Sequence, residues 1–252
     1  MLIRGIEEIQ RKAADFVQRG INLIYPEVCP VCMEIFNTGS GDAGVCENCR
    51  KKLKYIKTPR CLKCGKQIGS EEKQYCYDCA KRQHVFAQGV GVWSYTEDIS
   101  RSIYAFKYDN QRHFAKIYAK ELYSRCGNII NKWNAEVLIP VPLHADRMKM
   151  RGYNQALLIA KEFGRLANLP TDDEILIRER KTKPQKELND KERVKNLENA
   201  FKISKSIVEY KRVILVDDIY TTGTTMDACA KILKDKGAEE VYFAALCIGR
   251  GF

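Results

Sequence analysis

Two adjacent carboxylates and a threonine-rich turn follow a run of apolar residues in the stretch VILVDDIYTTGTT, residues 213–225. The turn contains no lysine, so it is not a Walker A loop, and it lacks the G-x-G-x-x-G spacing of a dinucleotide-binding turn. Gly223 allows backbone N–H groups to turn inward, and a helix that begins there adds a partial positive charge. With the threonine hydroxyls, these features suit a phosphate monoester. The predicted phosphate-binding residues are Thr221, Thr222, Gly223, Thr224 and Thr225.

The carboxylates of Asp217 and Asp218 would repel a phosphate, so we expect them to face a different group. The vicinal hydroxyls of a sugar fit, with Mg²⁺ nearby, because hydroxyls donate to carboxylates and Mg²⁺ prefers oxygen ligands. A phosphate at one end of the loop and a diol close by describe ribose 5-phosphate. The alternative is a helix cap of Asp and Thr that holds no ligand. Four threonines beside two acids are more than such a cap needs, so we favour the ligand site.

Eight of the eleven cysteines form four C-x-x-C pairs, separated by 13, 11 and 11 residues. Each such turn directs two thiolates at one point, and two turns complete a tetrahedral Zn²⁺ site with no open position for catalysis. We therefore predict two structural zinc sites rather than disulfides or an iron–sulfur cluster. The short gaps favour sequential pairing, and a cross-braced pairing stays open. In sequential order the ligands are Cys29, Cys32, Cys46 and Cys49 for one zinc, and Cys61, Cys64, Cys76 and Cys79 for the other.

The chain is basic, with 43 Lys and Arg against 32 Asp and Glu, which gives a net charge of +11. Each zinc site with four thiolates carries −2, so two of them lower the net charge to about +7. Residues 50–66, the basic stripe, hold eight Lys or Arg, no acid and one aromatic, Tyr55. Two interpretations fit equally well. The stripe follows the phosphate backbone of single-stranded DNA, or it is a solvated face that offsets the thiolates.

The threonine turn needs a strand before it and a helix after it, and the second half of the chain alternates such elements. This alternation predicts an α/β fold with a mainly parallel sheet, in which ligands bind at the carboxyl ends of the strands. Residues 145–155 are expected to form a second loop at that edge. The expected strands cover 89–95, 136–144, 174–177, 213–217 and 241–249, and the expected helices cover 100–108, 156–169 and 224–237.

One further segment, residues 106–123, mixes Lys, Arg and His with Phe and Tyr. Such a mixture can stack on and neutralise single-stranded bases, and it equally suits an amphipathic helix packed on a sheet, which we favour. The three remaining cysteines lie in apolar patterns and are expected in the core; they are Cys126, Cys229 and Cys247.

The stretch 213–225 closely resembles the 5-phosphoribosyl-1-pyrophosphate (PRPP) loop of type I phosphoribosyltransferases. The segments PEVCPVC (26–32), PVPLHADRMKMRGYNQA (140–156) and KTKPQKELNDKERVKNLENAF (181–201) are similar, in that order, to the ComF/ComFC competence-protein family. The resemblance covers nearly the whole chain. It implies a type I phosphoribosyltransferase-like domain preceded by a small double zinc ribbon. One departure is Met33, where a glycine often follows the second cysteine.

The resemblance also implies roles for particular residues. Asp217 and Asp218 would engage the ribose hydroxyls of PRPP, with Mg²⁺, and residues 221–225 would hold its 5-phosphate. The segment Gly152-Tyr153-Asn154-Gln155 would lie near pyrophosphate or an acceptor, and Lys107 would also reach the site. The catalytic residues, if the protein is an enzyme, would be Arg147, Lys149 and Arg151.

Two functions follow from this resemblance. The preferred one is uptake or processing of single-stranded DNA beside a helicase partner, with a pocket for PRPP or another phosphoribosyl compound. The alternative is an active phosphoribosyltransferase with an unidentified acceptor, and the sequence leaves open whether the protein is an enzyme. We expect an N-terminal helix at 1–27, the double zinc ribbon at 28–84 and the phosphoribosyltransferase-like domain at 85–252. We also expect a cytoplasmic protein without a transmembrane segment, because no apolar run approaches about 18 residues.

Overall fold

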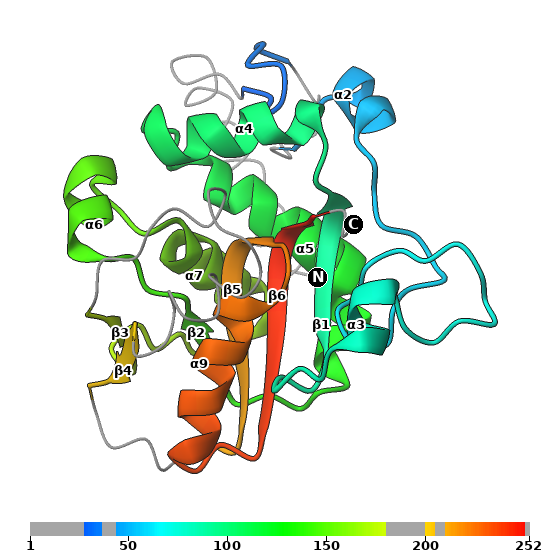
Figure 1. The fold of residues 1–252 in the computed structure, drawn as a ribbon. Coiled ribbons are helices and arrows are strands. Elements are labelled where there is room, and N and C mark those ends of the chain that lie inside the picture. Colours follow the sequence, from blue (N-terminus) through cyan, green and yellow to red (C-terminus); the bar gives the residue numbers. More distant parts are fainter. Residues whose placement is uncertain (1–27, 37–43, 180–199, 205–209, 250–252) are drawn as a thin grey trace, which may run out of the picture. The chain divides into compact units, whose positions relative to one another are not determined.

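The computed structural model describes residues 28–36, 44–179, 200–204 and 210–249 (Figure 1). The predicted N-terminal helix at 1–27 lies outside these residues, as does most of the segment 181–201. The chain divides into two compact units, residues 1–52 and 53–252. The domain limits expected from the sequence remain a prediction.

The larger unit is built on a four-stranded parallel sheet in the order β1-β6-β5-β2. Its strands are β1 (Gly89–Ser94), β2 (Val137–Pro140), β5 (Arg212–Tyr220) and β6 (Glu240–Ile248). Strand β5 is central, and its residues 213–216 are completely buried because both faces of the sheet are covered. The predicted parallel α/β fold is thus confirmed, and β5 delivers its aspartates to the carboxyl edge.

Four longer helices accompany the sheet: α4 (Glu97–Tyr108), α5 (Phe114–Asn131), α7 (Gln155–Ala167) and α9 (Thr224–Asp235). Helices α5 and α7 pack against each other and against one face of the sheet, and α9 packs on β5 and β6 from the opposite face (Figure 1). Helix α9 is attached to β5 by the threonine turn alone. The fold therefore places the amino end of α9 at the carboxyl edge of the sheet.

The second cysteine group covers the part of the sheet that α9 leaves open. Ile56, Cys64 and Phe86 are buried in the same apolar cluster as Phe243 of β6. Main-chain hydrogen bonds support this packing: the Ile56 N–H donates to the Val92 carbonyl at 2.9 Å. This ribbon is therefore part of the core of the larger unit, and the sheet would expose apolar surface without it.

A glycine on the first strand makes this packing possible. A Cβ atom at Gly89 would stand 2.0 Å from the ring of Phe243, so no larger residue fits. The ring of Phe243 stacks on Tyr220 at a centroid distance of 4.5 Å and meets Phe86 edge-on at 4.9 Å. The three rings join β5, β6 and the ribbon in one aromatic group.

The smaller elements confirm one expectation and contradict another. A strand was expected at 174–177, and β3 (Leu176–Arg178) lies there, paired antiparallel with β4 (Phe201–Ile203) in a separate two-stranded sheet. Residues 145–155 contain a helix, α6 (Ala145–Arg151), instead of a loop. This helix has no buried residue, so the apolar periodicity that marks a helix in the sequence is missing.

The segment 106–123 also divides differently from the favoured single helix. Its first residues end α4, and α5 begins only at Phe114. Phe114 and Tyr118 are fully buried, so they belong to the core and cannot stack on nucleic acid. The three cysteines expected in the core are fully buried as well: Cys126, Cys229 and Cys247.

In the smaller unit, the described residues are 28–36 and 44–52, which include the short helix α2 (Glu47–Lys52). The larger unit has one further short helix, α3 (Tyr77–Lys81), which carries the last cysteine of the second group. Among the residues that the structure describes, no helix is both long and apolar enough to cross a bilayer.

Candidate functional site

The aspartate pair lies at the carboxyl end of β5, beside a lysine from α4. The Lys107 ammonium is 2.7 Å from Asp218 Oδ2, and both side chains are mostly buried. Asp217 Oδ1 accepts a hydrogen bond from the Asp218 N–H at 2.8 Å. Lys107, which the family resemblance placed within reach of the site, therefore contacts the pair directly.

The surroundings of Asp217 disfavour its charge. Burial, followed by repulsion from Asp218, raises the pKa of Asp217 from 3.8 to about 7, although Lys107 and Arg178 act in the opposite direction. The role of Asp217 in binding a diol stays a prediction.

The threonine turn forms the other half of the site. Gly223 has a φ of 82° and precedes the first turn of α9, so the left-handed conformation that glycine favours is required here. The hydroxyls of Thr222 and Thr224 lie 2.9 Å apart. No side chain caps the amino end of α9. The N–H groups of its first turn, which have no partner within the helix, are therefore suited to an anion.

The three cations predicted to be catalytic all lie on α6. Arg151 donates hydrogen bonds to Gln155 Oε1 at 2.8 Å and to the Tyr108 hydroxyl at 3.0 Å, and its guanidinium lies over the Tyr108 ring. It is thus held between α4 and α7. Lys149 is exposed on α6, and Arg147 is half-buried.

The segment after α6 has a structural role. Tyr153 is buried and its hydroxyl donates to the Phe106 carbonyl. Asn154 caps α7 by accepting from the Ala156 N–H and donates to the Val141 carbonyl. These bonds tie α7 to the strands and to α4, so the described contacts of these residues are with the protein itself.

Arg178 is a cation at this edge that the sequence did not reveal. It lies on β3 close enough to Asp217 for their charges to interact. Burial, followed by repulsion from Arg147, lowers the pKa of Arg178, which places the two guanidinium groups near each other. Arg147 and Arg178 come from separate elements, and two neighbouring cations would suit an anionic group. No motif pointed to Arg178, because it stands in a short strand outside the segments that carry motifs.

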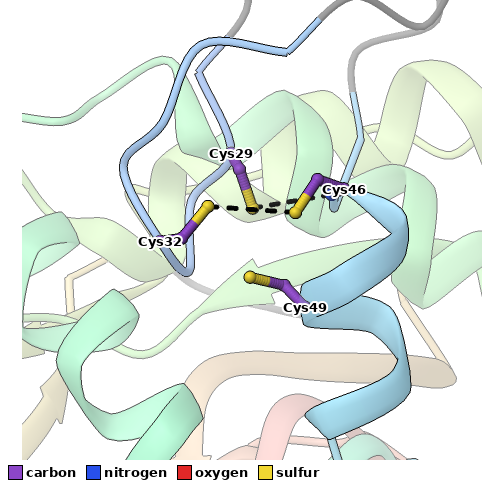
Figure 2. Close-up of side chains that lie close together, drawn as sticks. All are labelled: Cys29, Cys32, Cys46 and Cys49. Atoms are coloured by element: carbon purple, nitrogen blue, oxygen red, sulfur yellow. Dashed lines mark hydrogen bonds between the residues drawn. The ribbon is translucent and has the colours of Figure 1, made fainter.

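The eight paired cysteines meet in two groups, in the sequential order that the sequence favoured. Within each group the sulfur atoms lie within 4.8 Å of one another. Figure 2 shows the side chains of Cys29, Cys32, Cys46 and Cys49 converging from two segments of the chain.

The sulfur spacing fits a bound metal ion. Cys32 Sγ and Cys46 Sγ are 3.8 Å apart, and Cys64 Sγ and Cys76 Sγ are 3.7 Å apart. A tetrahedral ion with bonds of about 2.3 Å to sulfur requires an edge of about 3.8 Å. Zn²⁺ therefore fits both groups, and four thiolates would leave it no position for a substrate.

The thiol groups of the second site also need a cation. Hydrogen bonds from Cys64 and its neighbours lower the pKa of Cys61, while those from Cys61 and the others raise the pKa of Cys79. Without a positive charge the group can thus ionise only in part. A divalent ion removes this conflict because it attracts all four thiolates.

The first C-x-x-C turn of each group has a similar backbone, although a different residue follows its second cysteine. Gly65 has a φ of 72° and donates its N–H to the Cys61 carbonyl at 2.9 Å. Met33 has a φ of 62° and donates its N–H to the Cys29 carbonyl, also at 2.9 Å. The methionine therefore adopts the left-handed conformation in place of glycine.

The basic stripe is less uniform than its sequence. Lys66 pairs with Asp78 at 2.6 Å, and Arg60 donates to the Ile56 carbonyl at 2.7 Å. The ring of Tyr55 lies under Arg125 and against Trp93, so it is packed within the protein. Lysines 54 and 57 are exposed. Only part of the stripe in the larger unit is therefore turned toward solvent.

Comparison with known proteins agrees with this architecture. The model of the double zinc ribbon domain matches residues 20–80, and the model of the phosphoribosyl transferase domain matches residues 151–251. The fold and the site thus define a protein of the phosphoribosyltransferase type that carries a double zinc ribbon.

Relatives identify the family more closely. The chain is 35% identical over 203 residues to "Competence protein F" of Haemophilus influenzae, covering 79% of this chain and 87% of the relative. It is 29% identical to "Competence protein ComFC" of Bacillus subtilis, covering 78% and 80%. It is 27% identical to "DNA utilization protein YhgH" of Escherichia coli K12, covering 89% and 98%. The chain belongs to the ComF/ComFC competence-protein family.

Proposed function

We propose that this protein binds a phosphoribosyl compound such as PRPP and acts in the uptake or use of single-stranded DNA. The observation that carries the first part is the arrangement at the end of β5. There a carboxylate pair stands beside a threonine turn and the amino end of a helix. Under this proposal, Asp217 and Asp218 accept hydrogen bonds from the ribose hydroxyls, and residues 221–225 hold the 5-phosphate.

The charge of Asp217 supports the assignment of a diol to the aspartate pair. Its raised pKa reflects burial and repulsion from Asp218, and hydrogen bonds donated by two ribose hydroxyls would stabilise its charged form. Mg²⁺, bound with PRPP, would offset the negative charges of the ligand and the carboxylates.

The role in DNA use rests on the family and on charge. The relatives are named for competence and for DNA utilization. The protein stays basic after zinc binding, and the exposed lysines 54 and 57 belong to the segment that leads into the second ribbon. We propose a cytoplasmic protein that contacts single-stranded DNA through this stripe, beside a helicase of the uptake machinery.

Catalysis of phosphoribosyl transfer is the second candidate function. The observation that favours it is the pair of neighbouring arginines Arg147 and Arg178, of which Arg178 interacts with the charge of Asp217. These cations would stabilise the charge that develops on departing pyrophosphate. Arg151 would contribute by holding α6 against α4, and Lys149 lies exposed on the same helix, free to turn toward a ligand.

Thermal stabilisation by Mg²⁺-PRPP tests the binding proposal. The unchanged protein should be stabilised in proportion to the logarithm of ligand concentration above Kd. The double variant Asp217→Ala/Asp218→Ala should lose this response, whereas Asp173→Ala/Asp235→Ala, which removes two exposed acids, should keep it. Equal stabilisation of both variants would refute the assignment.

Two further measurements separate the functions. Release of pyrophosphate from Mg²⁺-PRPP with candidate acceptors, followed by ³¹P NMR, would establish transfer. Binding of single-stranded DNA should weaken steeply as salt increases, since a strand releases counterions when lysines neutralise its phosphates. Replacement of lysines 54 and 57 by glutamine should reduce the salt slope by about 1 to 2. An unchanged slope would contradict DNA contact at this stripe.

A further inference from the structure

The segment that leaves the second ribbon lies against the amino end of α9. His84 Nδ1 is 2.8 Å from Asp227 Oδ2, and the Val85 N–H donates to Asp227 Oδ1 at 2.8 Å. The His84 side chain is 1% exposed and that of Asp227 is 12% exposed. One carboxylate in the first turns of α9 thus fixes residues 84 and 85, which lie more than 140 positions earlier in the chain.

The same segment forms the wall behind the threonine turn. A Cβ atom at Gly223 would stand 2.8 Å from His84 Cε1 and 2.8 Å from the Tyr220 hydroxyl. The His84 ring in turn stacks on Phe86 at a centroid distance of 4.7 Å. The His84 ring, which packs on the aromatic group of the core, therefore sets the position of the threonine turn.

An arginine of this segment reaches the turn itself. Arg82 Nη2 is 3.4 Å from Asp227 Oδ2, and Arg82 Nη1 is 3.5 Å from Thr224 Oγ1, which it approaches as a donor. Thr224 Oγ1 is also 2.9 Å from Thr222 Oγ1. The Arg82 side chain is 34% exposed, so it is partly accessible to solvent beside the turn.

We propose that Arg82 is a phosphate-binding residue that supplies the cation missing from the threonine turn. The inference rests on the proposed function, because it assigns a further contact to the same phosphomonoester. A guanidinium has five N–H donors, so Arg82 can keep its contact with Asp227 while donating to a phosphate oxygen. Asp227 and His84 are positioning residues, since they act through Arg82 and the turn.

This assignment gives the second ribbon a direct part in ligand binding. Helix α3 carries Cys79 of the second cysteine group, and the Arg82 N–H closes the end of that helix by donating to the Asp78 carbonyl at 3.0 Å. Asp78 is itself paired with Lys66 of the neighbouring turn at 2.6 Å. The ribbon thus fixes the backbone from which the arginine extends.

Calorimetric titration with two separate probes tests the proposal. Ribose 5-phosphate carries the phosphate that Arg82 would contact. Inorganic pyrophosphate with Mg²⁺ lacks this phosphate, so its binding does not require Arg82. Arg82→Gln should weaken ribose 5-phosphate binding by about 10- to 100-fold, the value of one charge-assisted hydrogen bond, and leave pyrophosphate binding within about twofold. Arg82→Lys should recover part of the loss. Lys81→Gln, an exposed neighbour, should change neither affinity.

The outcomes are distinct. If the unchanged protein binds ribose 5-phosphate and Arg82→Gln binds it equally well, the assignment of Arg82 is wrong and the proposed function stands. If Arg82→Gln weakens both probes equally, Arg82 only maintains the fold of the site, and the proposal is overturned. If the unchanged protein binds neither ribose 5-phosphate nor PRPP, the proposed function fails, and this inference fails with it.

Discussion

Replacement of Asp217 by asparagine should make the ligand-free protein more stable while it abolishes binding of the ribose. Asparagine keeps the shape of the side chain and removes the charge that burial and Asp218 disfavour. The folded protein holds a proton on Asp217 up to about pH 7, whereas the unfolded chain releases it near pH 4. Between these values the folded state binds more protons. The free energy of unfolding therefore falls as the pH rises from about 4 to 7, and stays lower above that range.

The size of the effect follows from the same shift. A change from 3.8 to about 7 corresponds to about 4 kcal/mol, at about 1.4 kcal/mol for each pKa unit. This is an upper limit, because Asp217 is partly exposed and shares its titration with Asp218. We expect Asp217→Asn to gain about 1–2 kcal/mol at pH 8, which raises Tm by roughly 2–8 °C.

Urea denaturation at pH 8 and at pH 5 provides the assay. The gain from Asp217→Asn should be present at pH 8 and smaller at pH 5, where the native aspartate is already protonated. Asp173→Asn, at an exposed position, is the matched control and should change stability by less than about 0.5 kcal/mol at both values. A variant less stable than the native chain at pH 8, or a gain independent of pH, would refute the reasoning.

Three other expectations concern metal, backbone and charge. Metal analysis should find two zinc ions per chain, and one ion, or iron, would contradict the two four-cysteine sites. Met33→Gly should slow zinc loss to a chelator, because it relieves about 0.5–1 kcal/mol of strain in the left-handed backbone. Gly65→Ala should destabilise the protein, because the added Cβ would stand 2.5 Å from a backbone carbonyl oxygen. Faster zinc loss from Met33→Gly would oppose this. Lys107→Met should reduce stability by about 1–3 kcal/mol, because it leaves the mostly buried Asp218 unpaired. Arg101→Met is the control: it breaks an exposed pair on the same helix and should change stability by less than about 0.5 kcal/mol. Equal effects in a denaturation experiment would argue against the Lys107 pair.

The sequence predicted the features that depend on neighbouring residues. The apolar run 213–216 could only be a buried strand, and the glycine within four threonines required a turn before a helix. The cysteine pairs likewise fold locally, which is why their grouping followed their order. Helix α6 escaped prediction because it buries none of its residues, and its ends depend on His144 and on the left-handed Gly152.

The parts that could not be predicted depend on contacts between distant residues. Nothing near Asp227 indicates that its partners are His84 and Val85. Similarly, Arg178 approaches Asp217 only because β3 turns away from the main sheet. The contacts of Arg151 with Tyr108 and Gln155 likewise join separate elements, so the basic motif alone could not indicate them. The carboxylates and hydroxyls of a site can be found in one stretch of sequence, whereas its cations come from the folded chain.

The account depends most directly on the threonine turn holding the 5-phosphate of a ribose. Titration of the protein into Mg²⁺-PRPP, observed by ³¹P NMR, resolves that phosphate from the two of the pyrophosphate group. The resonance of the 5-phosphate should shift or broaden until the site is saturated, and Thr222→Val, which removes one hydroxyl at nearly constant volume, should weaken the effect. Broadening confined to the pyrophosphate resonances, or a response unchanged by Thr222→Val, would contradict the account.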